Sequence, residues 1–243
     1  MITKSKIKQI KSLARKKYRE QLKLFVVEGY KSIRELENAG LRILEIYVTE
    51  DSKELDDLKV IRISNKDMQS LSNLNTPPGY LAVVEVLKTD SLPTNGLVIA
   101  LDAVQDPGNM GTIIRLADWF NVKHILCNTG TVDLYNPKCV QATMGSIARV
   151  QVHYVDLNEF FGRTKLPILV TAMDAPSMYE SQFPKNGILL MGSESHGVSE
   201  ELMRSGKQIS IPNYCDGQNA TESLNVATAT AIILAEWQRS IGR

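Results

Sequence analysis

Polar side chains suited to binding and positioning a substrate occur in three loops of this sequence. The first loop carries Asn109 and Arg115, the second carries Glu194, and the third carries Ser223 and Asn225. A guanidinium binds a phosphate or carboxylate through two parallel hydrogen bonds, and the other side chains offer hydroxyl, amide and carboxylate groups. Neither a Ser-His-Asp order nor a cluster of metal ligands accompanies them in the sequence. These residues therefore indicate a ligand site that works by hydrogen bonding and charge, and no metal is expected.

Each loop taken alone also allows a structural explanation. Asn109 lies where a helix is expected to begin, so it could cap that helix, and Thr221 or Ser223 could cap the last helix of the chain. Arg115 stands among the apolar residues of 113–116, which are expected to be buried. A buried arginine has to pair with another group or reach a cleft. Capping and ligand binding both remain open at this point.

Glycines in the first two loops allow a close approach of the backbone. Gly108 and Gly111 do not form the G-x-G-x-x-G pattern, and Pro107 lacks a backbone donor, which argues against a dinucleotide site. Gly192 and Gly197 in the second loop fit either a ligand that approaches the backbone or a tight turn.

The elements that must position these loops are apolar strands alternating with helices in residues 97–243. We expect strands at 96–103, 122–127, 167–172, 187–191 and 208–211, and helices at 110–120, 137–148, 199–205 and 224–239. This alternation is typical of an α/β fold with a parallel sheet covered by helices on both faces. Ligands of such sheets bind beyond the carboxyl ends of the strands, where all three loops begin.

Residues 1–88 predict a second, smaller α/β domain, and residues 89–96 predict a linker that is polar and broken by Pro and Gly. In the small domain we expect strands at 24–27, 44–48, 60–63 and 80–86, and helices at 30–39, 52–58 and 65–71. Asn65 is expected to cap the last of these helices, and Gly40 to end the first of them in a left-handed conformation.

The N-terminal segment is strongly basic, although the whole chain of 243 residues has a formal net charge of only +1. Within residues 1–23, Glu20 alone opposes Lys4, Lys6, Lys8, Lys11, Arg15, Lys16, Lys17, Arg19 and Lys23. A solvated helix face explains such a block, but so many unopposed cations favour a polyanionic partner such as RNA or DNA.

Composition excludes several other classes of protein. No apolar run approaches the roughly 20 residues of a membrane-spanning helix, and the Lys-rich N-terminus is unlike a secretory signal. Cys127, Cys139 and Cys215 are widely spaced, which fits neither a disulfide framework nor a zinc site. We therefore expect a cytoplasmic globular protein with no membrane partner.

Three motifs around the polar residues resemble the signature motifs of the SpoU (TrmH-like) RNA ribose 2′-O-methyltransferases. They are Asp102-x-x-x-Asp-Pro-Gly-Asn-x-Gly-x-Ile-x-Arg115, Gly192-x-Glu-x-x-Gly197, and Ile211-Pro followed by Ser223-Leu-Asn-Val226. The resemblance covers residues 97–243. Residues 1–88 resemble more loosely the small RNA substrate-binding module of many members, notably at Phe25-Val-Val-Glu28-Gly29.

The resemblance implies S-adenosylmethionine as methyl donor and a catalytic domain whose C-terminal chain forms a deep trefoil knot. The positions that match the cofactor-binding residues of the family are Gly192, Ile211 and Leu224. Those that match its catalytic residues are Asn109, Arg115, Glu194, Ser223 and Asn225. The expected reaction is methyl transfer to a ribose 2′-hydroxyl, of rRNA rather than tRNA.

The resemblance also implies a homodimer with its active site at the subunit interface. Arg115 occupies the position of the proposed base, but a guanidinium is not deprotonated in proteins. Holding a phosphate and stabilising a developing alkoxide is the role that fits its chemistry. A non-catalytic RNA-binding or ribosome-assembly protein that keeps the fold is the alternative, and the absence of Arg115 or Asn225 would have favoured it. The sequence departs from the shorter family pattern by extra residues at 213–221, and no role is assigned to His196.

Overall fold

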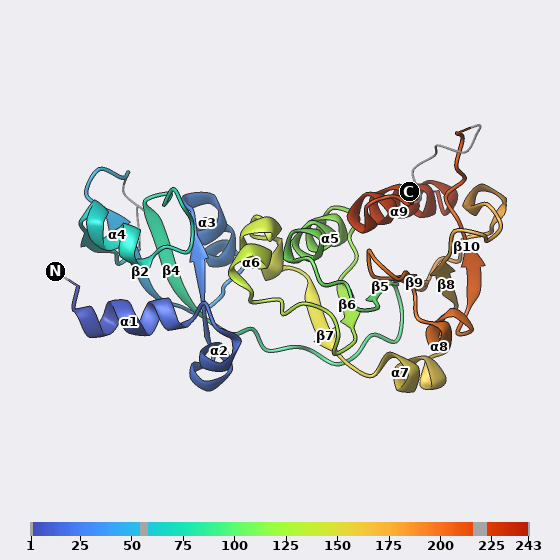
Figure 1. Ribbon diagram of the computed structural model, residues 1–243, viewed down its shortest axis with the longest axis horizontal. Helices are drawn as coiled ribbons and strands as arrows, with labels where there is room; N and C mark the ends of the chain where they lie inside the picture. The colour runs from blue at the N-terminus through green and yellow to red at the C-terminus, as the bar shows by residue number, and fades with distance from the viewer. Residues whose placement is uncertain (1, 54–57, 216–222, 243) are drawn as a thin grey trace. The chain divides into compact units, whose positions relative to one another are not determined.

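The computed structural model describes residues 2–53, 58–215 and 223–242, which form two compact units. The N-terminal unit comprises residues 1–88 together with Asp133–Ala148, and the C-terminal unit comprises Thr89–Val132 and Arg149–Arg243 (Figure 1). The segment Asp133–Ala148 therefore packs with the N-terminal unit although it lies far along the chain. The domain boundaries expected at 88 and 97 stay a prediction.

The N-terminal unit is built on a four-stranded sheet in the order β1-β4-β2-β3. β4 is antiparallel to β1 and β2, whereas β3 is parallel to β2. The strands are β1 (Leu24–Glu28), β2 (Ile43–Thr49), β3 (Ile61–Ile63) and β4 (Tyr80–Glu85). The helices are α1 (Lys4–Ser12), α2 (Lys16–Leu22), α3 (Tyr30–Asn38), α4 (Asn65–Leu71), α6 (Pro137–Thr143) and the 3₁₀ helix η1 (Ser146–Ala148).

The structure tests the helix ends expected at Gly40 and Asn65, but not the helix expected at 52–58. Gly40 has a φ of 74°, which confirms the left-handed end of α3. Asn65 does not cap α4, because the Ser64 hydroxyl one residue earlier accepts the hydrogen bond from the Asp67 N–H at 3.1 Å. The helix expected at 52–58 falls partly on residues 54–57, which lie outside the described part of the chain.

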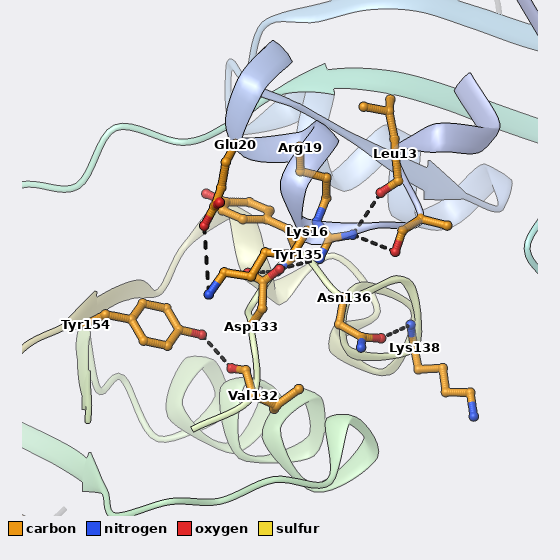
Figure 2. Close-up of polar contacts among 11 residues, drawn as sticks. Leu13, Lys16, Arg19, Glu20, Val132, Asp133, Tyr135, Asn136, Lys138 and Tyr154 are labelled. Carbon is orange, nitrogen blue, oxygen red and sulfur yellow. Dashed lines mark hydrogen bonds and ion pairs between the residues drawn. The ribbon is translucent and has the colours of Figure 1, made fainter. Parts of the chain in front are cut away.

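A buried arginine joins α2 to the segment Asp133–Ala148 within the N-terminal unit (Figure 2). The guanidinium of Arg19 donates to the carbonyls of Leu13 and Ala14 at 2.8 Å each and forms an ion pair with Asp133. Only 4% of Arg19 is exposed. A buried charge of this kind is tolerated because it is paired and hydrogen bonded. Arg19 is thus a structural residue and does not belong to the exposed basic surface.

Tyr135 anchors the same segment. Its ring packs on Phe25 with ring centroids 4.7 Å apart, and its hydroxyl accepts a hydrogen bond from the Leu87 N–H at 3.0 Å. Burial raises the pKa of this hydroxyl to about 12, so it stays protonated at neutral pH.

The C-terminal unit is a fully parallel six-stranded sheet in the order β10-β8-β9-β5-β6-β7, which confirms the expected parallel α/β fold. Its strands are β5 (Leu97–Leu101), β6 (His124–Cys127), β7 (Gln151–Tyr154), β8 (Ile168–Thr171), β9 (Gly187–Met191) and β10 (Lys207–Ile209). Its helices are α5 (Pro107–Trp119), α7 (Leu157–Arg163), η2 (Met178–Glu180), α8 (Glu200–Met203) and α9 (Val226–Ser240).

Helices cover both faces of this sheet, with α5 and α9 on one face and α7 and α8 on the other (Figure 1). The central strand β9 is buried along its whole length. On α9, Trp237 is fully buried and its indole N–H donates to the Pro184 carbonyl at 2.8 Å. Gln238 links α9 to α5 by donating to the Phe120 carbonyl at 2.9 Å. The knot implied by the family resemblance stays a prediction.

Because all six strands are parallel, their carboxyl ends share one edge of the sheet. The loops after β5, β9 and β10 therefore begin at this edge, as the strand pattern predicted. β7 and α7 were not expected from the sequence. The helix expected at 137–148 ends at Thr143, because Met144 and Gly145 both adopt a positive φ, and η1 follows.

Candidate active site

The side-chain amide of Asn109 joins the three loops at the carboxyl edge of the sheet. Its Nδ2 donates to Glu194 Oε1 at 2.6 Å, and its Oδ1 accepts from Asn225 Nδ2 at 2.9 Å. Three of the five predicted catalytic residues therefore form one continuous hydrogen-bonded chain that draws on all three motifs.

Asn109 is available for these contacts because another residue caps α5. Asp106 is the N-cap, and its carboxylate accepts the hydrogen bond from the Asn109 N–H at 2.7 Å. Pro107 occupies the first helical turn, where its missing N–H is not needed. The possibility that Asn109 itself caps the helix is therefore wrong.

Asn225 has a structural and an interhelical role at once. Its Oδ1 accepts from the N–H groups of Ala227 at 3.0 Å and Thr228 at 3.2 Å, which makes it the N-cap of α9. Its Nδ2 remains free to donate to Asn109. The helix thus begins at Val226, two residues later than expected, and the proposed cap at Ser223 is wrong. Thr221 lies outside the described residues.

The second loop is held by a buried carboxylate that sequence reasoning did not assign to the site. Asp102 is 4% exposed, and its two oxygens accept from Asn128 Nδ2 at 2.5 Å and the Ser199 N–H at 2.7 Å. Asn128 Oδ1 in turn accepts from the Ala103 N–H at 2.9 Å. Asp102 stands first in the opening motif, which was the available signal. Asn128 follows directly after a strand, but nothing in its local sequence marks it.

Gly192 is required by the backbone of its own loop. A Cβ at this position would lie 2.0 Å from the carbonyl carbon of Gly197. Ser193 and Gly197 exchange two backbone hydrogen bonds of 2.9 Å, which close the loop tightly. The loop therefore presents Glu194 and His196 as exposed side chains at its tip.

Arg115 is exposed rather than buried. Ile113, Ile114 and Ala117 turn toward the sheet, whereas Arg115 lies on the outer face of α5. Within the described part of the chain it forms no hydrogen bond or ion pair. Trp119, one turn further on, is 84% exposed. The guanidinium is thus available to a ligand or a partner. Ser223 is also exposed and is not joined to the Asn109 chain.

The predicted cofactor residues differ in exposure, and the loop after β8 adjoins one of them. Gly192 is buried, Ile211 is half-buried, and Leu224 is 50% exposed. Just before Ile211, Ser210 donates its hydroxyl to the Ala175 carbonyl at 2.7 Å, which ties the β8 loop to the end of β10. The sequence did not predict that residues 172–177 lie next to the site.

These residues fit S-adenosylmethionine in chemical character. Partly exposed apolar side chains at a sheet edge can cover an adenine, and loop backbone groups next to them can bind its polar edge. Ile211 and Leu224 supply such apolar surface. Among the described residues there is no group of three or more His, Cys, Asp and Glu side chains that could hold a metal. None of the helices in the same ranges has the length and apolar character to cross a membrane.

Comparison with known proteins places these features in a family. The SpoU rRNA Methylase family profile matches residues 96–235, and the MRM3-like substrate binding domain profile matches residues 4–82. The chain is 30% identical over 240 residues to the 23S rRNA (guanosine(2553)-2'-O)-methyltransferase RlmP of Bacillus subtilis, with 94% of each chain covered.

Two solved structures share the whole fold. An AdoMet-bound rRNA methyltransferase from Sinorhizobium meliloti is 27% identical with a TM-score of 0.85, and the alignment covers 100% of this chain and 97% of the other. A TrmH-family structure from Porphyromonas gingivalis is 35% identical with a TM-score of 0.85, covering 98% and 99%.

Proposed function

The chain belongs to the SpoU rRNA methylase family, and we propose that it transfers a methyl group from S-adenosylmethionine to a ribose 2′-hydroxyl of large-subunit rRNA. The observation that carries the proposal is the hydrogen-bonded chain Glu194–Asn109–Asn225, which joins the three family motifs at the carboxyl edge of a parallel sheet. The likeness to the B. subtilis 23S rRNA enzyme along nearly the whole chain supports the same substrate class.

The bound cofactor supplies an electrophilic methyl group on a sulfonium. The work of the protein is then to hold the ribose hydroxyl in line with that methyl group and to stabilise charge that develops on the oxygen. Arg115 carries a guanidinium that has no hydrogen bond or ion pair with the described residues, so it suits binding of the phosphate next to the reacting ribose. The Asn109 amide fixes Glu194 so that its second carboxylate oxygen remains available to the nucleotide.

The basic N-terminal helices supply the RNA-binding surface in this proposal. Three of their cations are engaged within the protein: Lys6 pairs with Glu45 at 2.6 Å, Lys16 with Glu20 at 3.8 Å, and Arg19 is buried. The exposed cations with no partner among the described residues are Lys4, Lys8, Lys11, Arg15, Lys17 and Lys23. Such cations bind phosphates and make affinity dependent on salt.

A homodimer completes the proposal. Trp119 is a large apolar side chain left almost fully exposed on α5, and Arg115 lies one turn before it. Tryptophan is enriched at surfaces that another chain covers. Arg115 would then act at the subunit interface. The proposal places this dimer in the cytoplasm.

Methyl mapping tests the activity. The purified protein is incubated with S-adenosylmethionine and large-subunit rRNA from cells that lack the gene, and 2′-O-methyl groups are mapped along the RNA. One new methylated ribose is expected, and Asn109→Ala should lower its formation at least 10-fold. An unchanged map, together with no cofactor binding by calorimetry, would favour a non-catalytic RNA-binding protein.

A further inference from the structure

A pocket of about 290 Å³ opens on the N-terminal unit, away from the three methyltransferase motifs in sequence. We propose that it binds one unpaired nucleotide of the RNA substrate. The residues that carry the argument are Tyr30, Lys31, Ser32, Tyr80, Gln141 and Met144, all of which line it. The inference rests on the proposed RNA substrate and adds a site that recognises single-stranded RNA.

Two tyrosines form a fixed aromatic wall of this pocket. The rings of Tyr30 and Tyr80 meet edge to face, with centroids 5.4 Å apart and planes at 69°. The Tyr80 hydroxyl donates to the Lys53 carbonyl at 2.9 Å, and the Arg34 guanidinium lies 5.8 Å from the centre of the Tyr30 ring. Tyr30 is nevertheless 40% exposed. A ring that is held in place but left open is suited to stacking with a base.

Polar groups without internal partners face the same space. Ser32 is 5% exposed, yet its hydroxyl forms no hydrogen bond with any described residue. The Gln141 side-chain amide likewise has no partner in the described ranges. The Ser32 oxygen is not fully enclosed and Ser32 lines the pocket, so its hydroxyl is open to a ligand there. An amide and a hydroxyl can pair with the donors and acceptors on the edge of a base.

The rim of the pocket favours a phosphate. α3 begins here after Gly29, which provides no side-chain cap, and its first turn carries no acidic residue. The free N–H groups of this helix start and the exposed Lys31 attract an anion. Glu28 also lines the pocket, but its carboxylate is already engaged by the Ser72 hydroxyl and by the Asn73 N–H at 2.8 Å.

The segment Asp133–Ala148 also contributes to the lining, through Gln141 and Met144. Gly145 has a φ of 93°, and a Cβ there would lie 2.6 Å from the Cβ of Glu35, so the turn after α6 packs closely on α3. Met144 stands just before it and is 45% exposed. Its polarizable thioether adds apolar surface to the lining of the pocket. A pocket lined by two tyrosine rings, a thioether, an amide and a hydroxyl, with an exposed lysine in its lining, fits an extruded nucleotide.

Binding of RNA to the full-length protein tests the site. Fluorescence anisotropy compares a twelve-nucleotide single-stranded RNA of mixed sequence with the same strand in a duplex. Tyr30→Ala should weaken binding of the single strand roughly 10-fold and leave duplex binding unchanged, because stacking requires an unpaired base. Tyr30→Phe keeps the ring and should bind as the wild type does. Gln141→Leu, on a different element, should weaken the single strand as well.

The outcomes separate this site from the proposed function. Suppose that the wild type methylates rRNA, but that Tyr30→Ala and Gln141→Leu bind the single strand as tightly as the wild type. The pocket assignment is then wrong, and the proposed methyltransferase function stands. Equal weakening of single strand and duplex would show a general phosphate surface and overturn the nucleotide site. A wild type that binds neither short RNA would overturn the nucleotide site, whereas the methyltransferase proposal depends on the methyl mapping. Circular dichroism of each variant checks that it is folded. If Tyr30→Ala does not fold, the single-strand affinities of Gln141→Leu and Tyr30→Phe still test the site.

Discussion

Asn225 donates a side-chain hydrogen bond to Asn109 across 2.9 Å, although 116 positions separate the two residues in the chain. The same Asn225 caps α9, and the same Asn109 holds Glu194. The start of the last helix, the start of α5 and the tip of the second loop are thus coupled through two amides. Helix capping and site assembly are one interaction network here.

This coupling predicts non-additive effects of substitution at the two asparagines. Asn109→Ala and Asn225→Ala should each lower methyl transfer at least 10-fold, and the double variant should lose little more than the worse single one. In urea unfolding, Asn225→Ala should cost about 1 kcal/mol because it also removes a helix cap. Thr112→Ala, one turn along α5, is the matched control. Fully multiplied losses in the double variant would show that the two amides act independently.

Arg115 should matter for methyl transfer and not for folding. Because it has no partner among the described residues, Arg115→Ala should change the free energy of unfolding by less than about 0.5 kcal/mol. Methyl transfer should be lost while calorimetry still detects cofactor binding. Arg163→Ala, an exposed arginine on α7, should retain activity. Equal loss of cofactor affinity in Arg115→Ala would place this residue in the wrong site.

The cofactor surface predicts the reverse pattern for Leu224. A carboxylate at this half-exposed apolar position would repel an adenine ring, so Leu224→Glu should abolish calorimetric binding of S-adenosylmethionine. Leu92→Glu introduces the same charge at a residue of similar exposure, 42% against 50%, and should bind S-adenosylmethionine with the wild-type affinity. Retained affinity in Leu224→Glu would refute its assignment to the cofactor.

The fold was predictable wherever apolar periodicity was strong. β9 was expected at its observed bounds, since Gly187–Met191 is apolar throughout and buried on both faces. β7 and α7 were missed because Gln151–Tyr154 mixes polar and apolar residues and is short. The packing of Asp133 against Arg19 was not visible either, because an ion pair between residues 114 positions apart leaves no local pattern.

The candidate site was predictable in its members and less so in their roles. Asn109, Glu194 and Asn225 were expected together, and their hydrogen bonds confirm that they meet. The caps considered from the sequence, Asn65, Asn109 and Ser223, were wrong. The observed caps are Ser64, Asp106 and Asn225, because several residues able to cap lie near each helix start and backbone geometry decides among them. Arg115 was expected to pair with another group or to reach a cleft, because its neighbours are apolar; helical periodicity instead places it on the exposed face, between inward neighbours.

Two cations of α2 should behave oppositely. Arg19→Ala leaves Asp133 without its partner in a mostly buried place, so it should destabilise the protein by about 3 kcal/mol in urea unfolding. Lys17→Ala removes an exposed cation and should change stability by less than about 0.5 kcal/mol. It should instead reduce the dependence of RNA affinity on salt. An unaltered salt dependence would locate the RNA surface elsewhere.

Two histidines on neighbouring strands should make stability depend on pH. His124 Nδ1 lies 3.1 Å from His153 Nε2, and His153 is buried. Burial lowers the pKa of both imidazoles, and the charge of His124 lowers that of His153 further, whereas Asp90 opposes both shifts. The unfolded chain therefore takes up protons that the folded chain does not as the pH falls through about 6.5.

The resulting sign is that stability is fully present above about pH 6.5 and declines below it. Urea unfolding at pH 7.5 and pH 5.5 measures this decline. The variant His124→Gln with His153→Gln has no imidazole at either position, so its stability should fall less between the two pH values. His196→Gln changes an exposed histidine outside the pair and should keep the wild-type dependence. A double variant that loses as much stability as the wild type would show that other groups cause the decline.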